Sequence, residues 1–237
     1  MKKVLLASTM LVATAGMAAA EITFDGFGRF GIFYSETDVA NASDTRIEQR
    51  FRLNIVGSAE TDGGVQFGAR IRLQSDENGT AGSSDFGNGG TGDIGAPEFN
   101  VQSGGFRLDV GNTSDVIDSG DVVDYYGFGV GLTAFLEQSS AFGLPASGFG
   151  NGGNVAPTIK ARYSMGDFTA AASYTENAAD DSREEWQVGF GYVFSAYAVG
   201  IAFGNEDDGS TDNDFWAASV SGSFSNVDFS VLVADTD

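Results

Sequence analysis

Basic residues in this chain alternate with apolar residues, and this spacing limits the possible folds more than any other feature. Between residues 46 and 55, charged and amide side chains occupy the even positions and mostly apolar side chains the odd ones. Residues 65–74 repeat the arrangement, with Arg70 and Arg72 in the polar set. Because successive side chains of a β-strand point to opposite faces, each segment predicts a strand with one apolar and one basic face. Such strands fit a soluble sandwich with the apolar face inward, or a membrane barrel with that face toward lipid.

The N-terminus has the layout of a secretory signal peptide. Two lysines precede an apolar run that ends near Met17, and three alanines at positions 18–20 supply small residues for a cleavage site. The run is too short to span a bilayer as a helix, which disfavours the alternative of a membrane anchor. We therefore predict a signal peptide over residues 1–20, cleavage after Ala20, and export of the mature chain.

The composition argues against several classes of function. The mature chain has 10 basic and 33 acidic residues, a formal charge of −23, which disfavours nucleic acid and anionic lipid as partners. The sequence has no cysteine and no histidine, so thiol chemistry and the commonest general base are both missing. It also has no Gly-x-Ser-x-Gly segment for acyl transfer. We predict that the protein is not an enzyme and has no cofactor.

About eleven strands are expected after residue 20, near 22–34, 46–58, 65–75, 98–103, 105–111, 157–165, 167–176, 184–194, 196–205, 214–224 and 226–234. The connections alternate in length: the long ones are 35–45, 76–97, 112–156, 177–183 and 206–213, and the short ones are 59–64, 104, 166, 195 and 225. A sandwich has no reason to sort its loops in this way, whereas an outer-membrane barrel has short periplasmic turns and longer external loops. The sequence therefore predicts an all-β, transmembrane, antiparallel up-and-down β-barrel whose first strand runs outward.

The odd number of predicted strands bears on how the barrel closes. The eleventh strand would end near Asp235, where an external loop is expected, and an open set of strands leaves two unpaired edges that hydrocarbon does not tolerate. We therefore interpret residues 21–237 as a C-terminally incomplete barrel. The alternative is a complete, smaller barrel in which one predicted strand is wrong, and the segment 98–103 is the first candidate.

Several segments also carry a family resemblance. They are EITFDGFGRFG at 21–31, the arginine-rich second strand, TDGG at 61–64 with the VQFGAR that follows, GFRLDVGN at 105–112, and YSMGDF at 163–168. In order and spacing they resemble the general diffusion porins of Gram-negative outer membranes, most closely the alphaproteobacterial type. The resemblance covers essentially the whole mature chain. It implies a sixteen-stranded homotrimer in outer-membrane lipid, with a third external loop that folds into the lumen. It also implies a last strand with a terminal aromatic residue, which this sequence does not contain.

The charged residues suggest how such a pore would work. The polar faces of the predicted strands hold all but one of the mature basic residues: Arg29, Arg46, Arg50, Arg52, Arg70, Arg72, Arg107, Lys160 and Arg162. The predicted constriction loop, about 112–156, has no basic residue and carries Asp115, Asp118, Asp121, Asp124 and Glu137. A basic wall that faces an acidic loop across a narrow aqueous gap produces a transverse field, which orients polar solutes. The alternative is charge balance, in which each arginine pairs with an acid such as Glu48 or Asp109.

The sequence therefore predicts an outer-membrane porin that forms a water-filled channel for the passive diffusion of ions and small hydrophilic solutes. The alternative is a non-conducting barrel, acting as an adhesin or structural protein, with a plugged lumen. Many inward positions between 198 and 223 are small, which leaves space in the lumen; if the face assignment is inverted there, they mark a subunit interface instead. The acidic segment 205–214 is interpreted as a solvated external loop, since it does not fit an EF-hand register. A structural Ca²⁺ between the acidic loop and the wall stays open.

Overall fold

The computed structural model describes residues 17–34, 44–76, 91–125, 144, 145, 149, 157–176, 184–207 and 209–236. In these ranges the chain forms twelve strands: β1 (Met17–Tyr34), β2 (Thr45–Thr61), β3 (Gln66–Asp76), β4 (Thr91–Ile94), β5 (Glu98–Ser103), β6 (Phe106–Gly111), β7 (Thr158–Met165), β8 (Phe168–Glu176), β9 (Glu184–Phe194), β10 (Tyr197–Asp207), β11 (Asp212–Phe224) and β12 (Val227–Thr236). A search of the same residues for a helix long and apolar enough to cross a membrane finds none.

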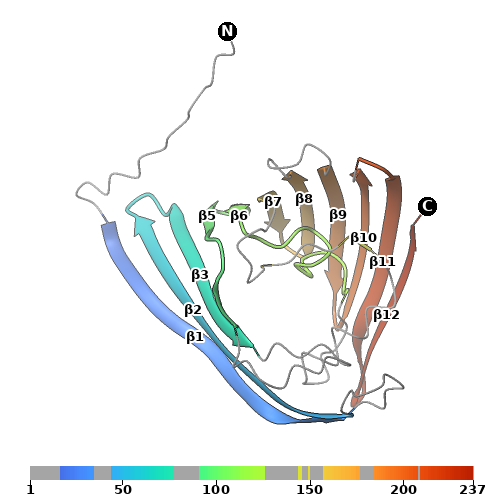
Figure 1. The fold of residues 1–237 in the computed structure, drawn as a ribbon. Helices are drawn as coiled ribbons and strands as arrows, with labels where there is room; N and C mark the ends of the chain where they lie inside the picture. The colour runs from blue at the N-terminus through green and yellow to red at the C-terminus, as the bar shows by residue number, and fades with distance from the viewer. Residues whose placement is uncertain are drawn as a thin grey trace.

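Eleven of these strands follow one another in a single antiparallel sheet, in the order in which they occur in the sequence. The sheet curves around a hollow, with β1 and β12 at its two ends (Figure 1). The predicted up-and-down arrangement of eleven strands is confirmed, including the doubtful segment 98–103, which is β5. The short strand β4 pairs with β3 off this path and was not predicted, because its sequence Thr-Gly-Asp-Ile has no alternation of apolar and polar residues. β1 begins at Met17, and the predicted cleavage after Ala20 and the incomplete barrel stay predictions.

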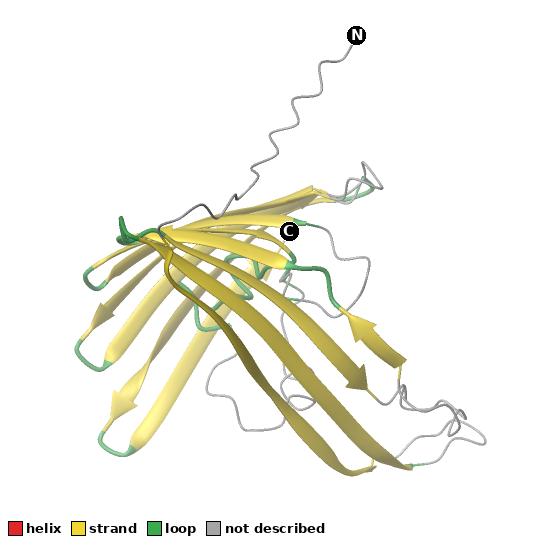
Figure 2. Cartoon of the chain, turned by 90° about the vertical axis from the view of Figure 1, so that its left-hand side faces the viewer, coloured by secondary structure: helices red, strands yellow, loops and turns green. Residues whose placement is uncertain are grey.

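The short connections are tight turns at one end of the sheet (Figure 2). Two-residue turns join β5 to β6, β7 to β8, β9 to β10, and β11 to β12. The first residue of each has positive φ: Gly104 (58°), Gly166 (60°), Ser195 (56°) and Ser225 (60°). Positive φ at this position is found in the type II′ turn, whose twist matches that of the flanking strands. These turns are four of the five short connections that the sequence predicted, and the fifth, predicted at 59–64, joins β2 to β3 through residues 62–65.

The sheet exposes its apolar side chains on the convex face. Phe30 is 92% exposed, Ile47 69% and Val231 56%, while Asn54 and Gln74 on the concave face are buried. A soluble sandwich would cover the apolar face with a second layer, and the described residues contain only this one sheet. The faces are therefore those of a barrel whose apolar side meets lipid and whose polar side lines the lumen.

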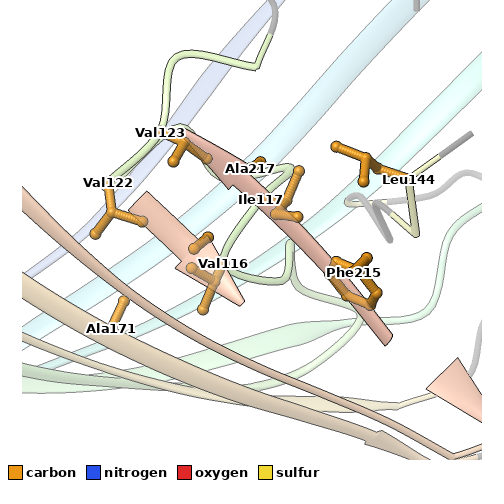
Figure 3. Packing of buried hydrophobic residues seen from close by; sticks show 9 residues of the cluster. Val116, Ile117, Val122, Val123, Leu144, Ala171, Phe215 and Ala217 are labelled. Atoms are coloured by element: carbon orange, nitrogen blue, oxygen red, sulfur yellow. The ribbon is translucent and has the colours of Figure 1, made fainter. Parts of the chain in front are cut away.

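A small apolar core lies inside the hollow rather than between layers (Figure 3). Its members from the long connection after β6 are Val116, Ile117, Val122, Val123 and Leu144, and those from the sheet are Ala171, Ala202, Phe215 and Ala217. The connection packs against small inward residues of the later strands, such as Gly200, Ala202 and Ala217, and fills the space beside them. Since these positions face the lumen, the alternative in which they form a subunit interface is wrong.

Candidate pore constriction

The first three strands present a row of arginines and amides to the hollow. Arg52 donates from Nε to Oε1 of Gln74 at 2.5 Å, and Arg72 donates from Nε to Oδ1 of Asn54 at 2.8 Å. Asn54 in turn donates to Oδ1 of Asp25 on β1 at 2.6 Å. These contacts follow from the register, which places Arg52 opposite Gln74 and Asn54 opposite Arg72. The hydrogen bonds hold the guanidinium groups of Arg52 and Arg72 against amide side chains of the neighbouring strand.

Arg29 and Arg50 continue this row toward the long connections. The two residues are directly opposite each other in the β1–β2 register, and both side chains are half-buried. Like charges in directly opposed strand positions repel each other. On the other side of β2, the register places Asp76 of β3 opposite Arg50. The side chain of Arg46 lies outside the described residues, as does that of Glu48, one of the acids named in the charge-balance alternative.

Farther along the sheet, arginines alternate with buried acids. Arg70 on β3 forms an ion pair with Glu98 on β5, and Arg107 on β6 contacts Glu98 at 3.4 Å and Asp109 at 2.6 Å. Glu98 and Asp109 are only 4% and 3% exposed. Buried carboxylates need partners of this kind, because an unpaired buried charge is strongly destabilising. Arg70 and Arg107 are therefore charge-balanced within the wall.

The connection after β6 lies close to the inner face of β8–β11 because that face is made of small residues. A Cβ atom added to Gly200 would lie 1.6 Å from the carbonyl oxygen of Val122. At Gly191 it would lie 3.2 Å from the Val122 Cα, and at Gly189 2.6 Å from a Val122 methyl carbon. These three glycines leave room for the loop backbone to pack directly against the sheet. The side chain of a larger residue would fill this room.

Polar side chains on four strands hold the loop in this position. The Val116 amide donates to Ser173 Oγ on β8 (3.3 Å), and the Ile117 amide to Gln187 Oε1 on β9 (2.9 Å). The Asp124 amide donates to Ser219 Oγ on β11 (2.8 Å), and its carboxylate accepts a hydrogen bond from Ser230 on β12 (2.7 Å). We refer to residues 115–124 as the docked segment. Each of these bonds satisfies a loop group that is shielded from water.

Asp121 attaches the docked segment to β7. Its two carboxylate oxygens contact Lys160 Nζ at 3.0 Å and Arg162 Nη1 at 2.5 Å. The side chains of Asp121 and Lys160 are 15% and 7% exposed. Burial by itself would raise the pKa of Asp121, but the charges and hydrogen bonds of Lys160 and Arg162 outweigh it, and the pKa lies below its ordinary value of 3.8. This aspartate is therefore ionised at neutral pH and bonded directly to two basic residues of the wall.

The other predicted acidic residues have different surroundings. Asp115 is fully buried and accepts a hydrogen bond from the Asp118 amide at 2.7 Å, which closes a turn inside the docked segment. The half-buried side chain of Asp118 follows this turn, and Glu137 lies outside the described residues. Among the residues that the structure describes, no three carboxylates gather where they could hold a metal ion, and the Ca²⁺ stays a prediction.

Between the wall and the docked segment lies a polar cavity of about 750 Å³. Its lining includes Asn54, Arg70, Asn100, Arg107, Ser119 and Arg162. Donors and acceptors surround this space, so it accommodates water and polar solutes and makes the entry of apolar solutes costly.

Sequence reasoning missed two aromatic residues of the site. Phe27 lies on the concave face of β1, with its ring centroid 5.1 Å from Arg52 Cζ. Phe149 lies over Arg70 and Arg72, at 3.7 and 4.4 Å between ring centroid and Cζ. The alternation at 21–31 could have placed Phe27, since it shares the parity of Arg29. No local pattern connects Phe149 with arginines almost eighty positions away.

Comparison with known proteins identifies the family. The model of the Gram-negative porin family matches residues 7–237. The chain belongs to the Gram-negative porins. This confirms the family and the outer-membrane location that the sequence predicted.

Individual relatives agree. The porin of Fuscovulum blasticum is 30% identical over 204 residues, which are 82% of this chain and 66% of that protein. A triple mutant of the Rhodopseudomonas blastica porin has a TM-score of 0.67 at 23% identity, covering 91% of this chain and 74% of that chain. A mutant of the same porin with five substitutions has a TM-score of 0.67 at 24% identity, covering 92% and 74%. The two structures confirm the β-barrel fold, and the chain spans about two thirds of the length of its F. blasticum relative.

Proposed function

We propose that the protein forms a water-filled channel in the outer membrane for the passive diffusion of ions and small hydrophilic solutes. The observation that carries this proposal is the polar cavity of about 750 Å³ on the concave side of a sheet whose convex side is apolar. Lipid contacts the apolar convex side and water contacts the polar concave side. The alternation of apolar and polar residues along each strand therefore matches both environments. Membership in the porin family supports the proposal.

The proposed mechanism is a transverse field between the two sides of the lumen. Arg29, Arg50 and Arg52 stand on β1 and β2, while Asp118, Asp121 and Asp124 belong to the docked segment on the inner face of β7–β12. Part of the charge is already compensated, because Arg70, Arg107, Lys160 and Arg162 have acidic partners. The field between the two sides orients solutes that carry a dipole or a charge.

Further proposals concern assembly, ligands, catalysis and cofactors. We propose a homotrimer embedded in outer-membrane lipid, with ions and small hydrophilic solutes as its passing ligands. We further propose that the protein has no catalytic activity and no cofactor, and that any bound Ca²⁺ has a structural role.

Conductance decides between the channel and a non-conducting adhesin. The docked segment fills the β8–β11 side of the lumen, which is the observation that favours an adhesin. The full-length protein, reconstituted into planar bilayers after its folded state has been verified by heat-modifiable gel mobility, should give stepwise conductance. A folded protein that gives no steps at any voltage refutes the channel.

Reversal potentials across a salt gradient test the field. Replacing Arg50 and Arg52 by glutamine should shift the permeability ratio toward cations, and Asp118→Asn with Asp124→Asn should shift it toward anions. Gln49→Ala, on the exposed convex face, is the control and should leave the ratio unchanged. Both shifts should disappear in molar salt, where the Debye length falls to about 3 Å. If the arginine and the aspartate variants both keep the ratio of the unmodified protein at low salt, the proposed field does not control permeation.

A further inference from the structure

Phe149, in the connection after β6, contacts the wall opposite the docked segment. Its carbonyl oxygen accepts a hydrogen bond from Nη1 of Arg72 at 2.9 Å. Its ring lies over both arginines of β3, 3.7 Å from Cζ of Arg70 and 4.4 Å from Cζ of Arg72. The same connection therefore contacts two sides of the lumen: the docked segment lies on β7–β12, and Phe149 lies on β3.

Both guanidinium groups also make polar contacts within the wall through their edges. Arg70 forms an ion pair with Glu98, and Arg72 donates from Nε to Asn54. A guanidinium binds carboxylates and phosphates through its edge and stacks through its face. The ring of Phe149 lies over the guanidinium groups of both arginines, 3.7 and 4.4 Å from their Cζ atoms, and covers part of their surface toward the lumen.

The position of the Phe149 ring over the two arginines also has an electrostatic effect. Arg70 and Arg72 are two positions apart on one strand, so their charges lie on the same face and repel each other. The negative face of an aromatic ring attracts a cation placed over it and offsets part of this repulsion. The ring also excludes water and ions from the place that a diffusing anion would otherwise occupy.

We propose that Phe149 is a specificity-determining residue of the channel: it shields Arg70 and Arg72 from anions in the lumen and thereby lowers the anion permeability. This inference rests on the proposed channel function, since shielding changes permeation only in a conducting pore. In this proposal, the uncharged side chain of Phe149 determines how strongly Arg70 and Arg72 attract anions.

Replacement of Phe149 should uncover the arginines. In a low-salt KCl gradient, Phe149→Ala should raise the chloride-to-potassium permeability ratio by about two- to fivefold, the factor that corresponds to a cation–π contact at a partly exposed site. Phe149→Leu keeps most of the bulk but has no aromatic face, and should give a smaller rise. Phe99→Ala removes an exposed ring from the convex face of β5 and should have no effect.

A double-mutant cycle separates shielding from simple widening of the pore. If Phe149 acts through the arginines, the effect of Phe149→Ala should vanish when Arg70 and Arg72 are both glutamine. An equal rise in that background, or no change in the ratio with Phe149→Ala in an otherwise unmodified conducting channel, overturns the inference.

Chemical modification gives a readout that needs no conductance. In folded protein, phenylglyoxal should modify Arg70 and Arg72 faster in the Phe149→Ala variant than in the unmodified protein, with the sites identified by mass spectrometry. Equal modification rates refute the shielding even if the channel proves not to conduct. Faster modification in a protein that does not conduct supports the shielding and overturns its role in permeation together with the proposed function.

Discussion

Replacing Gly200 by alanine should push the docked segment away from the barrel wall. A Cβ atom at Gly200 would lie 1.6 Å from the carbonyl oxygen of Val122 and 2.6 Å from its carbonyl carbon. Both contacts are with backbone, so no side-chain rotation relieves them. Since real Cβ atoms essentially never approach other heavy atoms closer than 3.0 Å, the loop must move toward the lumen by about 1.4 Å.

The energies indicate that the segment moves without leaving the wall. Inserting a methyl group into a packed site costs about 1–3 kcal/mol. This cost lowers the population of the loop in its observed position, relative to a displaced position, by about 5- to 150-fold. Burial of Val116, Ile117, Val122 and Val123 stabilises the docked segment by roughly 1.5 kcal/mol or more for each side chain. The ion pairs of Asp121 add to this. The total stabilisation of the docked segment exceeds the cost of one added methyl group. We therefore expect the segment to shift but to remain bound to the barrel wall.

Single-channel recordings in planar bilayers provide the assay. Gly200→Ala should conduct less than the unmodified protein and should show more current noise, because the loop has lost its single seated position. Gly31→Ala is the matched control, since no heavy atom lies within 4 Å of the added Cβ. If Gly200→Ala and Gly31→Ala give the same conductance and noise in folded protein, the loop is not seated on Gly200.

Two further predictions concern Asp121. Asp121→Asn leaves the buried Lys160 without its acidic partner, and we expect it to lower the free energy of unfolding by about 3 kcal/mol in urea titrations, with the exposed Asp62→Asn as an unaffected control. Because the pKa of Asp121 is lowered by docking, its contribution is complete above pH 3.8 and is lost as the pH falls through the docked value. Current noise should therefore stay constant between pH 8 and pH 5 and rise below about pH 3.8. The same acid-induced rise in Asp121→Asn would assign it to another group.

The strands, their order and their faces could be predicted from the sequence, because the information is local. A strand has a side-chain period of two, so the alternation around Arg50 and Arg70 assigns each residue to the lumen or to lipid without reference to any other part of the chain. The short turns are equally local, since Gly104 and Gly166 supply the positive φ that a two-residue hairpin needs. The strand β4 could not be predicted, because four residues with no alternation carry no periodic signal.

The contacts inside the lumen were decided by the tertiary structure alone. Sequence reasoning placed acidic and basic residues on opposite sides of a gap, but Asp121 is bonded directly to Lys160 and Arg162, and Arg107 to Asp109. It also interpreted the small residues of β10 and β11 as empty space, where the structure places the docked segment. Asp124 meets Ser230 across 106 positions, and Arg72 meets Phe149 across 77. Such pairs depend on how a long connection folds back onto a curved sheet, and a period of two residues carries no information about distances of that length.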